Sequence, residues 1–90
     1  MTISVTSQPT PNPNAMKFSV NRQLTEGASR TYGSAAEAAG DAVAAALFAV
    51  PGVKAVFILN DFVSVTKQPD AAWATLAPAA EAALREALAD

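Results

Sequence analysis

Residues 47–67 have the sequence LFAVPGVKAVFILNDFVSVTK, and this stretch decides the fold of the 90-residue chain. Its Pro51-Gly52 pair predicts the end of a helix, because both residue types interrupt helical hydrogen bonding. The two apolar runs that follow are separated by Asn60-Asp61, a spacing typical of antiparallel strands joined by a two-residue turn. The stretch therefore predicts a helix followed by a β-hairpin.

The register that a two-residue turn imposes, with Leu59 opposite Phe62, sorts the hairpin side chains onto two faces. One face, which we take as the core face, holds four β-branched residues: Val56, Ile58, Val63 and Val65. The opposite face holds Phe57, Leu59 and Phe62. This second face is either covered, by a helix or by the connection at 21–33, or is a docking surface. Burial is the simpler interpretation, because monomers expose few large apolar patches.

Two further strands are predicted near the N-terminus, where apolar and polar residues alternate over residues 2–8 and 15–20. Between them, Pro9, Pro11 and Pro13 restrict the backbone and predict a rigid loop.

The segment before the hairpin predicts a connection and a helix. Residues 21–30 have few apolar side chains and predict a long connection, with a short edge strand near 29–32. Ser34 and Glu37 have the spacing of a capping box, so a helix is expected to begin at Ser34. Gly40-Asp41 interrupts it and produces either a kink or a second helix capped by Asp41.

The C-terminal part predicts another helix that opens at Pro69-Asp70. Its buried side is marked by apolar residues at helical spacing: Trp73, Leu76, Ala80, Leu84 and Leu88. Pro78 lies inside this pattern and predicts a kink or a new first turn near residue 77. Together the elements predict one domain, residues 1–90, of the α+β class. Its antiparallel sheet has ββαββα order, with both helices on one face.

The chain contains no cysteine and no histidine, which excludes the commonest metal and catalytic sites. Zinc, copper and iron–sulfur centres use thiolate or imidazole ligands, and Ser-His-Asp catalysis needs an imidazole. Ser64 and Lys67 have the Ser-x-x-Lys spacing of some acyl-transfer enzymes, but residues three apart in a strand point to opposite sides. We therefore predict a protein that is not an enzyme and has no catalytic, cofactor-binding or metal-binding residue.

The formal net charge of −2, with scattered basic residues, argues against a nucleic-acid-binding protein. The N-terminus lacks the pattern of a signal peptide, and the alanine-rich stretch 35–50 is too short to cross a membrane. The absence of cysteine suits the cytoplasm. We expect a cytoplasmic protein that binds neither nucleic acid nor membranes and is a monomer or a weak homodimer.

Four parts of the sequence carry a resemblance to a known family. They are, in chain order, Asn12-Pro13-Asn14-Ala15-Met16-Lys17-Phe18, Leu47-Phe48 with Val50-Pro51-Gly52-Val53, Val56-Phe57-Ile58 with Asp61-Phe62-Val63-Ser64-Val65-Thr66-Lys67, and Trp73 with Leu76 and Pro78. In this order they resemble the N-terminal domain of Nfu-type (NifU-like) iron–sulfur scaffold proteins. The resemblance implies an α+β domain and covers the chain from residue 6 to residue 88.

Many members of that family continue into a second domain whose Cys-x-x-Cys motif holds the cluster. This chain has no cysteine and looks like a stand-alone N-terminal domain. The resemblance therefore implies contact with partners, or with a cluster-carrying domain on another chain, and assigns no residue here to the cluster. Asp41 stands where many members have Ser-Pro at the start of a helix.

We predict partner binding at two places, the loop Asn12, Pro13 and Asn14 and the hairpin face Phe57, Leu59 and Phe62. The loop asparagines either hydrogen-bond a partner or cap the loop through their own backbone, and the second interpretation is the simpler one. Trp73 is interpreted as a core residue rather than as an interface anchor.

Our first hypothesis is a non-catalytic interaction module, accessory to iron–sulfur cluster assembly or transfer, that binds a scaffold or client protein. The alternative is a regulatory domain that responds to a small ligand or a divalent metal. In that case the oxygen ligands would come from Asp61, Asp70 and Glu37.

Overall fold

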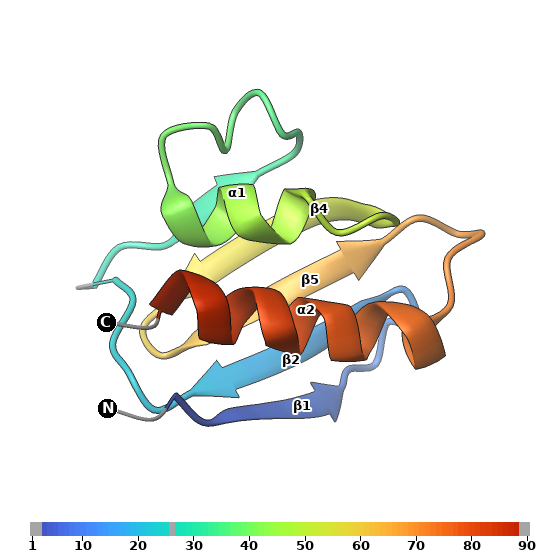
Figure 1. The fold of residues 1–90 in the computed structure, drawn as a ribbon, viewed down its shortest axis with the longest axis horizontal. Helices are drawn as coiled ribbons and strands as arrows, with labels where there is room; N and C mark the ends of the chain where they lie inside the picture. Colours follow the sequence, from blue (N-terminus) through green and yellow to red (C-terminus); the bar gives the residue numbers. More distant parts are fainter. Residues whose placement is uncertain (1–2, 26, 89–90) are drawn as a thin grey trace.

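The computed structural model describes residues 3–25 and 27–88, in which five strands and two helices are found. The elements are, in chain order, β1 (Val5–Pro9), β2 (Ala15–Val20), β3 (Arg30–Tyr32), α1 (Ala42–Phe48), β4 (Val53–Leu59), β5 (Phe62–Lys67) and α2 (Trp73–Leu88). The strands form one antiparallel sheet in the order β1-β2-β5-β4-β3. Both helices lie on one side of this sheet (Figure 1), which confirms the predicted α+β class and the placement of the helices.

β3 is the element that the predicted ββαββα order lacked. It pairs Arg30 with Ile58 and Tyr32 with Val56, at one edge of the sheet. It lies where the sequence indicated a short strand within the connection at 21–30. A three-residue strand is too short to show a convincing alternation, so its pairing depends on the neighbouring strand.

The hairpin register is confirmed. Leu59 lies opposite Phe62 and Ile58 opposite Val63, as the two-residue turn requires. Asn60 has a φ of 54°, in the left-handed region that asparagine enters more readily than most residues. Near the other end of the hairpin, Lys54 has no partner residue in the ladder with β5, because the register shifts between Val53 and Ala55.

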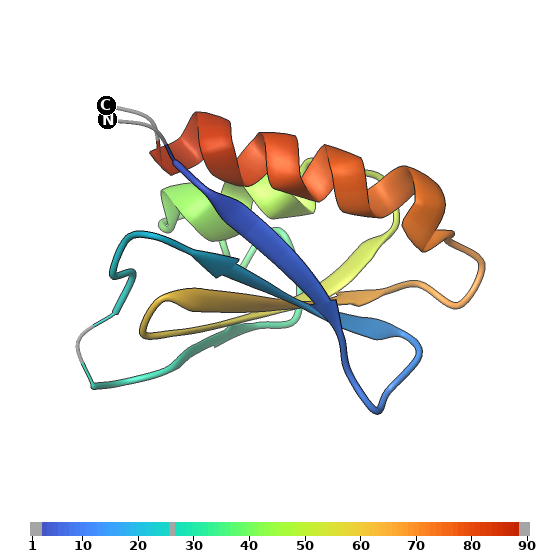
Figure 2. The same cartoon turned by 90° about the horizontal axis from the view of Figure 1, so that it is seen from below.

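The hydrophobic core lies between the sheet and the two helices (Figure 2). Its largest fully buried side chains are Phe18, Leu47, Ile58, Leu84, Val56, Val63 and Val65. The predicted stripe of the last helix is buried at Leu76, Ala80, Leu84 and Leu88. Alternation in the strands therefore identified the core side of the sheet, and helical spacing identified the core side of α2.

The predicted helix at Ser34 is wrong. Residues 35–40 form turns, and α1 begins only at Ala42. Half of the capping box is present, because Ser34 Oγ accepts a hydrogen bond from the Glu37 N–H at 3.2 Å. This segment buries only Ala38, and a short helix without a buried face is not stable in water. The expected cap at Asp41 is confirmed, since its carboxylate accepts hydrogen bonds from two backbone N–H groups at the start of α1.

Two predicted boundaries also differ. β1 runs from Val5 to Pro9 rather than over residues 2–8, and residues 1–2 lie outside the described part. Pro9 is tolerated because an edge strand has one side without ladder bonds. α2 begins at Trp73, so Asp70 lies in the preceding turn and does not cap the helix. Pro78 neither ends α2 nor starts a new turn, and the helix continues through it.

Gly52, in the turn after α1, lies close to Ala71 and Leu76 at the start of α2. Its φ is +98°, and a Cβ atom there would lie 2.9 Å from the Cβ of Ala71 and 3.2 Å from Cδ1 of Leu76. Only glycine combines this backbone conformation with such a close approach.

Candidate interaction surfaces

The side of the sheet opposite the helices has no helix over it in the described part of the chain (Figure 2). Phe57, Leu59 and Phe62 lie on this side and are half-buried. None of the three packs against the hydrophobic core. Within the connection at 21–33, the N–H groups of Leu24 and Thr25 donate to the Asn60 carbonyl at the hairpin turn, and Arg30–Tyr32 form β3 at the edge of the sheet. Burial under a helix is therefore wrong for the described part of the chain, and the use of this side as a docking surface stays a prediction.

The side chains on this side contact one another. The rings of Phe57 and Phe62 have centroids 6.2 Å apart and are tilted by 44°. The Lys17 ammonium lies 4.5 Å from the centroid of Phe62, a cation–π contact between β2 and β5. We call Lys17, Phe57, Leu59 and Phe62 the outer patch. Sequence reasoning missed Lys17. Alternation along β2 places it on the same side as Ser19, which lies opposite Phe62.

The Asn12-Pro13-Asn14 loop is ordered by its own polar groups. Asn12 Oδ1 accepts from the Asn14 N–H at 2.9 Å. Thr10 Oγ1 donates to the carbonyl oxygens of Asn12 at 2.9 Å and Ala15 at 3.0 Å. The interpretation that the loop is capped through its own backbone is thus correct for Asn12, and Asn12 and Pro13 remain exposed.

Two side chains from outside the loop also hold it. Trp73 Nε1, on α2, donates to the Pro13 carbonyl at 2.9 Å. Lys67, at the end of β5, donates from Nζ to Asn14 Oδ1 at 3.1 Å. Lys67 is on the same side of β5 as the buried Val63 and Val65. Trp73 is half-buried against Phe18, at a centroid distance of 6.4 Å, so it is both a packing residue and a tie to the loop.

The loop lies at the other end of β2 and β5 from Phe62 and its partner Leu59. Ala15, next to the loop, lies opposite Thr66, whereas Ser19 lies opposite Phe62. Four residues of extended chain span about 13 Å. The six predicted partner-binding residues are therefore in two places rather than in one continuous site.

The metal-binding alternative is not supported. Asp61 lies in the hairpin turn, Asp70 in the turn before α2 and Glu37 in the segment before α1. Asp61 and Asp70 are separated by the whole of β5. Over residues 3–25 and 27–88, no three acidic side chains gather where they could hold a metal ion.

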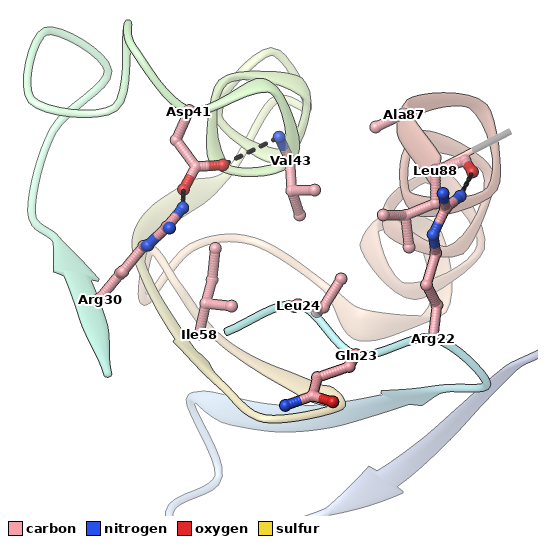
Figure 3. A pocket seen from close by; sticks show the side chains of 9 residues that line it. All are labelled: Arg22, Gln23, Leu24, Arg30, Asp41, Val43, Ile58, Ala87 and Leu88. Carbon is pink, nitrogen blue, oxygen red and sulfur yellow. Dashed lines mark hydrogen bonds and ion pairs between the residues drawn. The ribbon is translucent and has the colours of Figure 1, made fainter. Parts of the chain in front are cut away.

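A cavity of about 340 Å³ opens between the ends of the two helices (Figure 3). Two arginines stand on opposite sides of it: Arg30 reaches Asp41, and Arg22 donates to the carbonyl of Leu88 at the end of α2. Leu24 and Ile58 are among its apolar residues. Both arginines in this cavity bind protein oxygens, and we assign the arrangement a structural role.

Asp41 is the centre of the contacts at one side of this cavity. Its Oδ2 accepts from Arg30 Nη1 at 3.2 Å and from the Tyr32 hydroxyl at 3.0 Å, while Oδ1 accepts from the N–H groups of Val43 and Ala44. Burial alone would raise the pKa of Asp41, but these hydrogen bonds outweigh it and hold the pKa below its ordinary value. The carboxylate thus ties the edge strand β3 to α1.

Comparison with known proteins assigns this chain to a family. The family model described as "Scaffold protein Nfu/NifU N terminal" matches residues 5–90. Among curated proteins, the chain is 38% identical over 77 residues to NifU-like protein 5, mitochondrial, of Arabidopsis thaliana, covering 86% of this chain and 28% of that protein. It is 36% identical over 75 residues to the NFU1 iron-sulfur cluster scaffold homolog, mitochondrial, of Homo sapiens, covering 82% of this chain and 30% of that protein. The chain thus spans less than a third of these relatives.

Two solved structures share the fold. The crystal structure of protein SAV1430 from Staphylococcus aureus has a TM-score of 0.79 at 35% identity, with 92% of this chain and 98% of that chain covered. The solution structure of a NifU-like protein from Saccharomyces cerevisiae has a TM-score of 0.83 at 26% identity, with 94% and 77% covered. In the described residues, neither helix has the length and apolar character needed to cross a bilayer.

Proposed function

Because this chain belongs to the family of Nfu/NifU scaffold proteins, through their N-terminal domain, we propose that it is a non-catalytic module that binds a scaffold or client protein in iron–sulfur cluster assembly. The family supports a role in cluster assembly. The binding role rests on one observation: three large apolar side chains, Phe57, Leu59 and Phe62, are half-buried on a side of the sheet that no helix of residues 3–25 and 27–88 covers.

Physical chemistry favours a partner for such a surface. Partly exposed aromatic side chains in the middle of a sheet lose contact with water when a partner covers them, and buried aromatic residues dominate many interfaces. The rigid sheet also holds them in place, so little conformational entropy is lost on binding. The Asn12-Pro13-Asn14 loop, fixed by Trp73 and Lys67, is a second and separate candidate contact.

The test is an amide NMR titration of the labelled protein with a purified scaffold domain that carries the Cys-x-x-Cys motif, in apo and cluster-loaded forms. Shifts at Phe57, Leu59 and Phe62 are expected if the outer patch is the contact. Shifts confined to residues 12–14 would move the contact to the loop, and no shift with either form would contradict the proposal.

A variant pair sharpens this test. Phe62→Asp places a charge in the outer patch and should abolish binding, with the fold intact by circular dichroism. Ala82→Asp introduces the same charge at an exposed position of α2, on the helix side, and should bind as the unmodified protein does. Equal binding by the two variants would remove the outer patch from the interface.

The location and the oligomeric state stay predictions. The relatives named above are mitochondrial by name, and a cytoplasmic location for this chain is to be tested by cell fractionation. A monomer or weak homodimer is to be tested by light scattering over a range of protein concentrations.

A further inference from the structure

The outer side of the sheet differs in charge from the rest of the chain. The chain has eight acidic and six basic residues. No aspartate or glutamate lies in any of the described strands, and Lys17 is the one charged residue whose ladder position is on the outer side. A net-negative protein thus presents a positive group among apolar side chains, and a partner with complementary charge would be acidic.

The outer patch lies in the interior of the sheet rather than at an edge. Its residues come from β2, β5 and β4, the three central strands. At Lys17, Phe57 and Phe62 the strand has neighbouring strands on both sides, and only Leu59 lies beyond the end of β3. A partner that covers the patch therefore binds mainly through side chains rather than by adding a strand.

The spacing within the patch fits one face of a helix. The ring centroids of Phe57 and Phe62 are 6.2 Å apart, and side chains one turn apart on a helix are separated by about 5–6 Å. Lys17 lies beside Phe62, with its ammonium 4.5 Å from the ring centroid. An acidic side chain flanking the apolar stripe of a bound helix would therefore meet Lys17 while the stripe covers the rings.

We propose that the outer patch binds an amphipathic helix of a partner protein whose apolar stripe is flanked by acidic residues. The proposal rests on the function proposed above and specifies the partner surface. A second copy of this chain fits less well, since its outer side brings another Lys17 and no carboxylate from the described strands.

The test uses two synthetic peptides as probes. Both are helix-stabilised, about 18 residues long and identical in their stripe of leucine and phenylalanine; they differ only in flanking residues, glutamate in one and lysine in the other. The glutamate peptide should shift the amides of Lys17, Phe57, Leu59 and Phe62. At low ionic strength it should bind about threefold or more tightly than the lysine peptide. Equal affinities, or shifts outside the outer patch, would overturn the proposal.

Charge variants give a second, independent readout. Lys17→Glu should reverse the order of the two peptides, and Lys17→Gln should abolish the preference. Lys54→Glu makes the same charge change at an exposed residue that is out of register in β4, and it should keep the preference for the glutamate peptide. A Lys17→Gln protein that still prefers the glutamate peptide would show that the preference does not come from an interaction of Lys17 with the acidic residues of the peptide.

The same variants separate this inference from the proposed function. If the Cys-x-x-Cys scaffold domain binds but neither peptide does, the function stands and the acidic helix is wrong. If the glutamate peptide binds with the expected reversal but the scaffold domain does not, the outer patch recognises a different acidic partner. Concentration-dependent dimerisation that blocks the glutamate peptide would assign the patch to a second copy and overturn the proposal.

Discussion

Trp73 Nε1 donates a hydrogen bond of 2.9 Å to the carbonyl oxygen of Pro13, sixty residues earlier in the chain. This bond fastens the loop between β1 and β2 to the first residue of α2. Lys67 fastens the next loop residue, Asn14, from the end of β5. The proline-rich loop is therefore held by side chains of two other elements as well as by its own turns.

Replacing Trp73 with phenylalanine should release this loop while keeping an aromatic ring near Phe18. We expect the free energy of unfolding to fall by about 0.5–1.5 kcal/mol, the usual value of one hydrogen bond. Denaturant unfolding measures the loss, and amide shifts at residues 12–15 locate it. Unchanged amide shifts there would show that the indole does not fix the loop.

The glycines give a graded test of backbone strain. Gly52→Ala should cost about 2 kcal/mol or more, because it combines a φ of +98° with contacts at 2.9 and 3.2 Å. Gly27→Ala has a φ of +83° but no neighbour within 4 Å, so it should cost about 1 kcal/mol through the backbone alone. Gly40→Ala, with neither feature, should lie within about 0.5 kcal/mol of the unmodified protein. Thermal unfolding of the three variants checks this order.

Asp41 should make the stability of the protein depend on pH in the acid range. Its pKa is lower in the folded protein than in the unfolded chain, so its contribution is complete above the ordinary aspartate pKa and is lost as pH falls through the folded value. Asp41→Ala should cost about 0.5–2 kcal/mol at pH 7 from loss of the helix cap, and the difference should shrink as the pH is lowered below about 4.

Urea unfolding between pH 7 and pH 3 measures this dependence. Asp70→Ala, in the exposed turn before α2, is the matched control and should follow the unmodified protein. A difference between Asp41→Ala and the unmodified protein that stays constant down to pH 3 would contradict the assignment.

Ile58 and Leu59 are neighbours in β4 with opposite surroundings, and truncating each should separate the core from the outer patch. Ile58 is 2% exposed, and Ile58→Ala should cost about 2–5 kcal/mol. Leu59→Ala, on the outer side, should cost less than about 1 kcal/mol but weaken partner binding. Similar losses of stability for both would mean that the outer side is packed like the core.

The elements whose buried residues recur at a regular spacing were predicted correctly from the sequence. The Asn60-Asp61 turn set the register that put Val56, Ile58, Val63 and Val65 in the core, and helical spacing gave the buried side of α2. Prediction failed at Ser34, because a capping box and several alanines satisfy local rules without supplying a buried face. The short edge strand near 29–32 was left out of the predicted ββαββα order, because three residues carry too little alternation.

For the candidate sites, alternation assigned Phe57, Leu59 and Phe62 to one side but did not show whether anything covers that side. Coverage depends on where both helices pack and where the connection at 21–33 runs. The contacts of Trp73 and Lys67 with the Asn12-Pro13-Asn14 loop join segments more than fifty residues apart, which no local pattern reveals.

The two edges of the sheet limit how this protein can meet other chains. Pro9, the last residue of β1, has no N–H to offer to a further strand. At the other edge, β3 covers only Val56 to Ile58 of β4, and the exposed, irregular Lys54 lies beyond it. Irregular backbone, proline and charge at sheet edges all oppose fibre-like stacking of strands. A protein that keeps two phenylalanines partly in water is thereby protected from polymerising through its backbone, and contact through side chains remains the open route.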